Sequence, residues 1–424
     1  FGATGSDLNN VGGTNRISVI ANTVQLGRSA GVGGGVTLQT LSGNAALDNM
    51  EANTVVTRDV YGGVHVAYFD PAAKAVIYRH SADAAQWDPA KSVALPYVDN
   101  FAAGTNYPGI ASNLTMVMDS KRIWVAYTII TGLSRRNIML GYCDFADGTF
   151  LNAPGNRCEE FSSKWNFRVY DSASAASFSH FNQLAITYSG ITERLHFIYA
   201  TGESYAYTYC EPTATNNYCT ATAANGGSTP TELQRELRAT AVQGFSGWSN
   251  AVYLPNFGGS GAQVLDLRMY VAPTSSKAQP FENKIHYMYQ VGSGNVTEGI
   301  YYVGCTDHCL AGGRGTAKTM AASIGPLDRP TGLDFRATEV SAGSYRIFMA
   351  YEKGGVITTV TQRYTFSNDS IAVDSLPGLT NSYSTHAMTG ASSAAAQNEI
   401  AVEFKPTSRL PIIVFRSATN KLFY

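Results

Sequence analysis

The stretch VHVAYFDPAAKAVIY, residues 64–78, decides the fold. Two runs of β-branched and aromatic residues flank a turn that contains Pro71, and this pattern is typical of a β-hairpin. Val64, Val66 and Tyr68 fall at alternate positions, so one face of the first strand is apolar. The same pattern returns five more times along the chain, which makes the hairpin the unit of a repeat.

Each copy of the pattern has an aromatic residue near the end of the first hairpin strand. These residues are Tyr68, Tyr127, Tyr199, Tyr289, Tyr351 and Phe415. A short strand precedes each hairpin and a fourth often follows it, so each copy predicts a four-stranded antiparallel meander. One meander cannot bury both faces alone, and its neighbours must stack on it. The sequence therefore predicts an all-β fold, a six-bladed β-propeller with one blade per copy.

The domain organisation follows from where the copies lie. The β-propeller is expected over residues 53–424, with repeats at about 53–100, 106–172, 180–256, 261–328, 331–378 and 384–424. The last copy ends with its third strand, so another segment must supply its outer strand. The Gly-rich segment 1–52 holds two apolar runs and is expected to provide a strand that closes the ring, which would remove an exposed sheet edge. A seventh blade within residues 1–52 is the alternative.

Composition narrows the class of protein and its partners. Of the 424 residues, 44% are hydrophobic and 14% are charged, which predicts a large folded core. The formal net charge is −1 and no basic run occurs, so no nucleic-acid partner is expected. No apolar run approaches the roughly 20 residues of a membrane span. Only Thr229–Arg238, which opens with a capping box, predicts a short helix.

The cysteines predict local disulfides and an oxidising setting. The expected pairs are Cys143 with Cys158, Cys210 with Cys219, and Cys305 with Cys309. Free thiols in a cytosolic protein and a zinc site are the alternatives. Zinc is disfavoured because no pair has C-x2-C spacing, and no metal or cofactor is expected. Disulfides favour an extracellular or cell-surface location, with the periplasm also open.

Three histidines occupy the same place in three copies of the repeat. They are His65, His196 and His286, found in Val-His-Val, Leu-His-Phe and Ile-His-Tyr. Residues that repeat by blade lie in different sheets and do not converge on one point. The pattern therefore predicts a recurring structural hydrogen bond instead of a metal site.

The segment Ser81-Ala-Asp-Ala-Ala-Gln-Trp87 resembles a degenerate Asp-box, and Gly244–Ser249 is a partial echo of it. Over roughly residues 53–424 the chain resembles extracellular bacterial β-propellers related to sialidases and to six-bladed fucose-type lectins. The sialidase resemblance implies an arginine triad, a Tyr–Glu pair, an acidic Asp and an Arg-Ile-Pro motif. No Arg-Ile-Pro is present; Arg16-Ile-Ser and Asp328-Arg329-Pro are poor substitutes. Lectins of this type use Arg, Glu and Trp in every repeat, and these copies lack a consistent Arg/Glu pair.

These observations favour binding over catalysis, and no catalytic residue is assigned. The predicted function is an exported or cell-surface recognition module, lectin-like or adhesin-like, that binds a carbohydrate or a surface protein through loops at one mouth of the propeller. The candidate ligand-binding residues in these loops are Asn106, Tyr107, His180, Phe181, Asp328, Arg329 and His386. A sialidase-like glycoside hydrolase is one alternative. A structural tip or head domain of a larger surface fibre is the other.

Overall fold

The structure is a computed structural model, and it divides the chain into two compact units, Phe1–Ala175 and Ala176–Tyr424, which are described separately. It describes residues 15–20, 23–29, 36–40, 54–58, 63–70, 75–81, 92–95, 110–119, 122–131, 135–144, 158–159, 164–174, 182–189, 192–200, 205–213, 219, 252–253, 264–272, 284–292, 299–306, 308–310, 312–322, 333–353, 356–374, 383–386, 400–404, 411–416 and 422–423. The segment predicted to form a short helix, Thr229–Arg238, lies outside these residues.

The first unit contains three antiparallel sheets, each a meander in chain order. They are β1 (Asn15–Ile20), β2 (Thr23–Ser29) and β3 (Val36–Thr40); β4 (Thr54–Arg58), β5 (Val64–Asp70), β6 (Ala75–Ser81) and β7 (Ser92–Ala94); and β8 (Ile110–Met118), β9 (Arg122–Thr131), β10 (Arg135–Asp144) and β11 (Trp165–Ser174). The hairpin predicted from residues 64–78 is confirmed as β5 and β6, with Tyr68 opposite Ile77.

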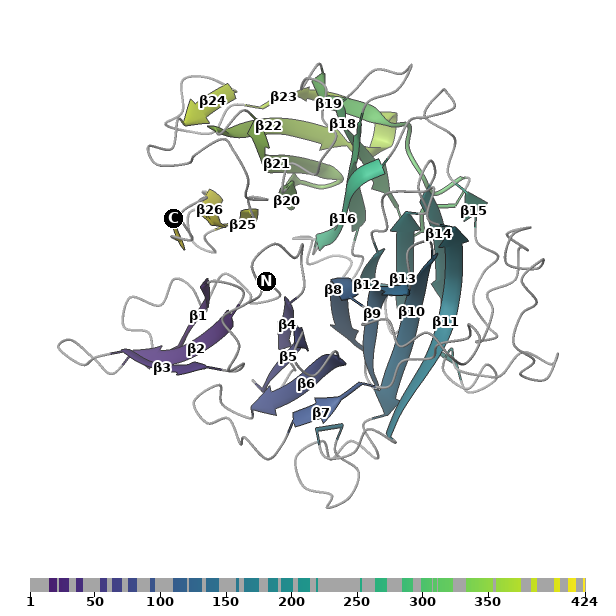
Figure 1. Cartoon of the computed structure of the whole chain (residues 1–424). Coiled ribbons are helices and arrows are strands. Elements are labelled where there is room, and N and C mark those ends of the chain that lie inside the picture. Colours follow the sequence, from purple (N-terminus) through teal and green to yellow (C-terminus); the bar gives the residue numbers. More distant parts are fainter. Residues whose placement is uncertain are drawn as a thin grey trace. The chain divides into compact units, whose positions relative to one another are not determined.

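The second unit contains four antiparallel sheets, drawn from teal to yellow in Figure 1. They are β12 (Asn182–Ser189), β13 (Thr192–Ala200), β14 (Tyr205–Cys210) and β15 (Val252–Tyr253); β16 (Val264–Ala272), β17 (Lys284–Val291), β18 (Gly299–Cys305) and β19 (Lys318–Ala322); β20 (Asp334–Ser341), β21 (Ser344–Lys353), β22 (Val356–Thr365), β23 (Ser370–Val373) and β24 (Tyr383–His386); and β25 (Ile400–Phe404), β26 (Pro411–Arg416) and β27 (Leu422–Phe423). A 3₁₀ turn, η3 (Phe366–Asn368), lies between β22 and β23.

The all-β class and the four-stranded antiparallel sheets are confirmed. Among the described residues there is no α-helix. The described N-terminal strands β1, β2 and β3 pair with one another, and β25, β26 and β27 form a separate sheet. The number of blades and a ring closed by an N-terminal strand stay predictions, as do the domain boundaries.

Neighbouring sheets pack face to face, because their strands are apolar on both sides. In β17, Tyr287 and Tyr289 enter one buried core with Leu267 of β16. The next residue, Met288, points to the other side and enters a second core with Phe335 of β20. All five of these side chains are fully buried. A strand that is buried on both faces is what stacked meanders require.

The three repeated histidines form the predicted structural hydrogen bond. In each case the histidine Nδ1 lies 2.6 Å from a tyrosine hydroxyl on the next strand: His65 with Tyr78, His196 with Tyr207, and His286 with Tyr302. Every histidine and tyrosine in these pairs is fully buried. The tyrosine always stands two residues before the register partner of the histidine. One side-chain pair is thus built into the second and third strands of three sheets.

Two other sheets replace both members of this pair together. Trp124 of β9 and Phe348 of β21 stand where the histidine would be, and Leu140 and Thr359 stand where the tyrosine would be. The indole nitrogen of Trp124 donates instead to Asp119 Oδ2 at 2.8 Å. Replacing both partners avoids an unsatisfied buried hydroxyl or imidazole, which would cost about 1–3 kcal/mol.

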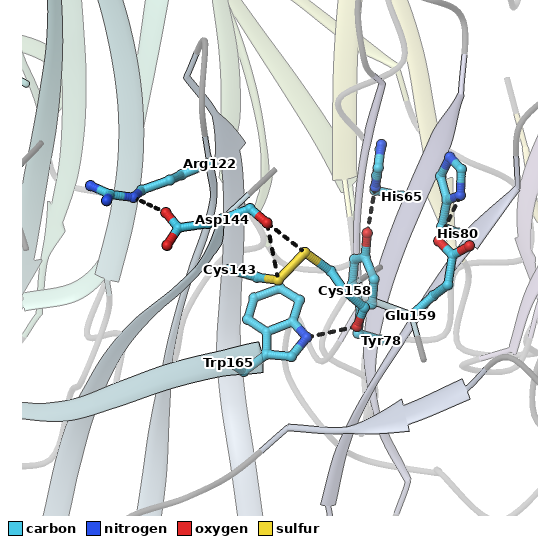
Figure 2. The surroundings of a disulfide bond; sticks show 9 residues. All are labelled: His65, Tyr78, His80, Arg122, Cys143, Asp144, Cys158, Glu159 and Trp165. Carbon is cyan, nitrogen blue, oxygen red and sulfur yellow. Dashed lines mark hydrogen bonds and ion pairs between the residues drawn. A yellow bond between two sulfur atoms is a disulfide. The ribbon is translucent and has the colours of Figure 1, made fainter. Parts of the chain in front are cut away.

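The three predicted disulfides are confirmed, and within the described residues no cysteine is free. Figure 2 shows the surroundings of Cys143–Cys158, where the Trp165 indole nitrogen donates to the Cys158 carbonyl at 2.8 Å. Three disulfides favour a protein of an oxidising, extracellular environment. A search of the described residues finds no helix that is long and apolar enough to cross a membrane.

Two disulfide loops also hold a side chain against a neighbouring sheet. Glu159, next to Cys158, places Oε2 2.9 Å from Nδ1 of His80 on β6, and both side chains are buried (Figure 2). His308, next to Cys309, stacks on Tyr209 of β14 with ring centroids 5.6 Å apart and planes within 6°. His80 and Tyr209 are equivalent, because they are the register partners of His65 and His196.

Candidate functional site

The seven residues predicted to bind a ligand lie almost entirely beyond what the structure describes. Asn106, Tyr107, His180, Phe181, Asp328 and Arg329 are outside the described residues. His386 is the last residue of β24, where its backbone is in register with Ile357 of β22. Their role in binding stays a prediction.

The candidate site lies instead on the first strands of three consecutive sheets of the second unit. Strand β20 packs beside β16 on one side and beside β25 on the other, as Figure 1 shows. Side-chain contacts follow the same order along β16 and β20: Arg268 reaches the backbone just before β20, and Tyr270 reaches Arg336 farther along it. The two strands therefore begin at the same end of the unit.

Near its start each of these two strands carries the same short motif, an aspartate and an arginine separated by one apolar residue. The residues are Asp266 and Arg268 on β16, and Asp334 and Arg336 on β20. Because alternate residues of a strand share a face, each arginine lies on the same side of its strand as its aspartate. We refer to these four residues as the Asp–Arg cluster.

Asp266 is the most buried member of the Asp–Arg cluster, with 1% of its surface exposed. Its Oδ1 accepts a hydrogen bond from the backbone N–H of Leu267 at 2.8 Å and lies 3.4 Å from Nε of Arg268. Its Oδ2 is buried and has no hydrogen-bond partner among the described residues. An ionised carboxylate with one bare oxygen is costly in such a place.

Burial accordingly raises the pKa of Asp266, and the nearby charge of Asp334 raises it further. The charge of Arg268 and the backbone N–H groups of Leu267 and Leu333 act against this increase in pKa without cancelling it. The environment therefore favours the protonated acid more than an exposed aspartate would allow. A protonated Oδ2 would be a proton donor that no described group already uses.

Asp334 has a different environment, because it is held by positive and donor groups. The Nη1 atom of Arg336 lies 3.1 and 3.2 Å from its two carboxylate oxygens. The backbone N–H of Val402, on β25, donates to its Oδ2 at 2.8 Å. Asp334 is also more accessible than Asp266, with 14% of its side chain exposed. Two strands from neighbouring sheets, β20 and β25, thus fix one carboxylate.

The arginines complete the arrangement. Nε of Arg268 donates to the carbonyl of Leu333 at 2.9 Å, which ties β16 to the start of β20. Arg268 is the most exposed of the four side chains, at 24%. A buried carboxyl whose pKa is raised, near a second carboxyl group that an arginine and a backbone N–H hold, is suited to acid–base chemistry. Among the described residues, no group of three or more His, Cys, Asp and Glu could hold a metal ion.

The Asp–Arg cluster was not among the residues predicted from the sequence, although the sequence carries a signal for it. Asp266-Leu-Arg268 and Asp334-Phe-Arg336 occur at the start of the first strand in two successive repeats. With 31 acidic residues in the chain, a pair of carboxylates could not be chosen by composition alone. The repeated spacing, aligned on the predicted first strands, would have singled out these two.

Comparison with known proteins gives distant structural likeness only. No protein-family model and no curated protein sequence matches the chain. It is similar to a solved α-L-arabinofuranosidase from Fusarium graminearum, with 10% identity over 88% of this chain and 90% of that one and a TM-score of 0.45. It is also similar to an intramolecular trans-sialidase from Ruminococcus gnavus, with 11% identity over 90% and 94% and a TM-score of 0.38. An endo-arabinase from Bacteroides thetaiotaomicron gives 9% identity over 74% and 93% and a TM-score of 0.33.

These comparisons correct the leading functional prediction. The sequence analysis placed a non-catalytic recognition module first, whereas the similar structures named above are enzymes that process glycosides. The comparisons contradict the prediction of a recognition module. The sequence pointed to binding because it showed no complete catalytic motif, but carboxylate pairs are set by spatial arrangement and leave no such motif.

Proposed function

We propose that this protein is an exported glycoside hydrolase whose two working carboxyl groups are Asp266 and Asp334. The observation that carries the proposal is the contrast between them. Asp266 is buried with one oxygen bare and its pKa raised, whereas Asp334 is held by Arg336 and the Val402 N–H. Glycosidases use two carboxyl groups whose environments keep one protonated and the other ionised.

The roles follow from these environments. Asp266 serves as the general acid and gives its proton to the glycosidic oxygen as the bond to the anomeric carbon breaks. Asp334 serves as the carboxylate, either accepting a proton from the attacking water or first bonding to the anomeric carbon. Arg336 stays on Asp334 throughout. Arg268, the most exposed of the four, contacts hydroxyl groups of the sugar.

Substrate contacts beyond this pair come from the loops predicted from the sequence. Asp328 and Arg329 precede Asp334 closely in the chain and are assigned to the sugar-binding surface. The β-propeller scaffold and a location outside the cell belong to the same proposal. The three disulfides support that location, because such bonds persist in oxidising compartments.

The test is turnover by the purified chain of a panel of aryl glycosides that includes α-L-arabinofuranoside and sialoside, together with arabinan and other polysaccharides. Wild type should release the aryl group or reducing sugar from at least one substrate. Asp334→Asn and Asp266→Asn should each lower kcat by about 100- to 10,000-fold, the usual contribution of a positioned acid or base.

A matched control comes from another aspartate in an arginine-rich setting. Asp374 is buried and accepts from Arg346 at 2.6 Å and from Arg363 at 2.9 Å. Asp374→Asn should leave kcat near the wild-type value. No turnover of any substrate by wild type would remove the proposal, and equal losses in all three variants would show that the carboxylate pair is only structural.

A further inference from the structure

Arg336 makes a contact that the acid–base roles do not use. Its Nη1 is shared between the Asp334 carboxylate and the Phe335 carbonyl, which it reaches at 2.8 Å. Its guanidinium carbon also lies 5.0 Å from the centre of the Tyr270 ring, within the range of a cation–π interaction. Only 11% of the Arg336 side chain is exposed.

Tyr270 belongs to the strand that carries the other carboxyl group. It lies on β16 at an even spacing from Asp266 and Arg268, so all three share one face of the strand. Its ring also packs edge-on against Phe335 of β20, with centroids 6.3 Å apart. The contact of Tyr270 with Arg336 therefore links the strand of Asp266 to the group that orients Asp334.

We infer that Tyr270 is a positioning residue: its ring holds the Arg336 guanidinium, and so fixes the Asp334 carboxylate relative to Asp266. This inference rests on the proposed function. An arginine with nothing against its face can change rotamer and take the carboxylate with it. A carboxylate displaced by about 1 Å can lose on the order of 100-fold in rate, because the reacting atoms no longer meet in line.

The experiment compares two replacements of Tyr270 with a matched pair elsewhere in the same unit. Tyr270→Phe keeps the ring and should keep kcat within about two-fold of wild type. Tyr270→Leu removes the ring and should lower kcat by about 10- to 100-fold with little change in KM, since Tyr270 itself does not contact the sugar. Tyr209→Leu is the control, because Arg194 lies over the Tyr209 ring at the same 5.0 Å; its kcat should not change.

Three results would overturn the inference: a wild-type kcat in Tyr270→Leu, an equal fall in Tyr209→Leu, or an equal fall in Tyr270→Phe. If Tyr270→Leu does not fold, Arg336→Lys replaces it, since lysine keeps the charge but lacks the flat face that stacks on the ring. That variant should show the same fall in kcat, and a wild-type kcat would count against the inference. Asp334→Asn, assayed alongside, separates the two proposals. If Asp334→Asn keeps full activity, the proposed function fails, because the carboxylate pair is then not catalytic. If Asp334→Asn is inactive and Tyr270→Leu is fully active, only the positioning role of Tyr270 fails.

Discussion

The buried His–Tyr pairs and the Asp–Arg cluster are two kinds of polar construction in one scaffold. The pairs repeat in three sheets with the same 2.6 Å contact and leave no surface for a ligand. The Asp–Arg cluster occurs on two adjacent strands, and Asp266 Oδ2 has no hydrogen-bond partner within the part of the chain that the structure describes. A buried histidine–tyrosine pair that recurs in three sheets supports the fold, whereas two carboxyl groups and two arginines brought together on adjacent strands are a candidate for chemistry. An unpartnered atom does not by itself separate the two, because His286 Nε2 also has no hydrogen-bond partner among the described residues.

The largest effect expected from this contrast is acid destabilisation by the buried histidines. Burial lowers the pKa of His286 to about 3, with a smaller contribution from Lys284, while the unfolded chain titrates near 6.5. Below about pH 6.5 His286 becomes protonated in the unfolded chain, whereas in the folded protein it stays neutral. The free energy of unfolding should therefore fall by about 1.4 kcal/mol per pH unit between about pH 6.5 and 3, or more than about 3 kcal/mol at pH 4.

The measurement is denaturant unfolding at pH 7 and pH 4 of wild type and of the double variant His286→Phe with Tyr302→Phe. Phenylalanine is chosen because Phe348 already occupies the equivalent place in β21. Removing both partners leaves no buried hydroxyl without a partner. Because the variant lacks the His286 imidazole, its free energy of unfolding should fall by about 3 kcal/mol less than that of wild type between pH 7 and pH 4. An unchanged difference between the two pH values would mean that His286 does not stay neutral in the folded protein.

The next effect concerns the disulfide loops, which the comparison assigns to the fold. Cys143→Ala with Cys158→Ala should lower the free energy of unfolding by about 3 kcal/mol, because the bond closes a loop of 15 residues and holds Glu159 on His80. Cys305→Ala with Cys309→Ala opens a separation of only 4 residues and should cost about 2 kcal/mol.

Thermal unfolding of the two cysteine variants gives the stability, and glycoside turnover well below the unfolding temperature gives the activity. Turnover should stay near wild type in both, since neither loop contributes to the Asp–Arg cluster. A selective loss of kcat in one variant, at a temperature where that variant is fully folded, would place part of the active site in its loop. The assignment of that disulfide loop to the fold alone would then be wrong.

The fold was accessible from the sequence because its signal is redundant. Alternating apolar residues, repeated aromatics and close cysteine pairs each predict the same short strands and local bonds, as the hairpin at Val64–Tyr78 and the three disulfides show. A recurring structural hydrogen bond of the three histidines was predicted for the same reason, but its tyrosine partner was not. The Asp–Arg cluster was missed because its chemistry depends on which strands lie side by side. The one local signal, the Asp-x-Arg spacing shared by Asp266 and Asp334, emerges only when the first strands of successive repeats are aligned.

The prediction with the smallest expected effect concerns the register partner of the histidine. It asks whether the residue at this position contacts the neighbouring sheet in every sheet that has the histidine. Gly304 is the register partner of His286, as His80 is of His65 and Tyr209 is of His196. A methyl group added at Gly304 would collide with the buried Tyr364 ring of the next sheet. Gly304 is thus contacted by Tyr364 of the next sheet, as His80 is contacted by Glu159 and Tyr209 by His308.

Gly304→Ala should therefore cost about 1–3 kcal/mol through overpacking, measured by thermal unfolding. In a double-mutant cycle with Tyr364→Leu most of that cost should vanish, because the ring that meets the new methyl group is gone. A cost that persists without the ring would point to backbone strain at residue 304. Contact between this position and the neighbouring sheet would then be limited to the two sheets where a disulfide loop supplies Glu159 or His308.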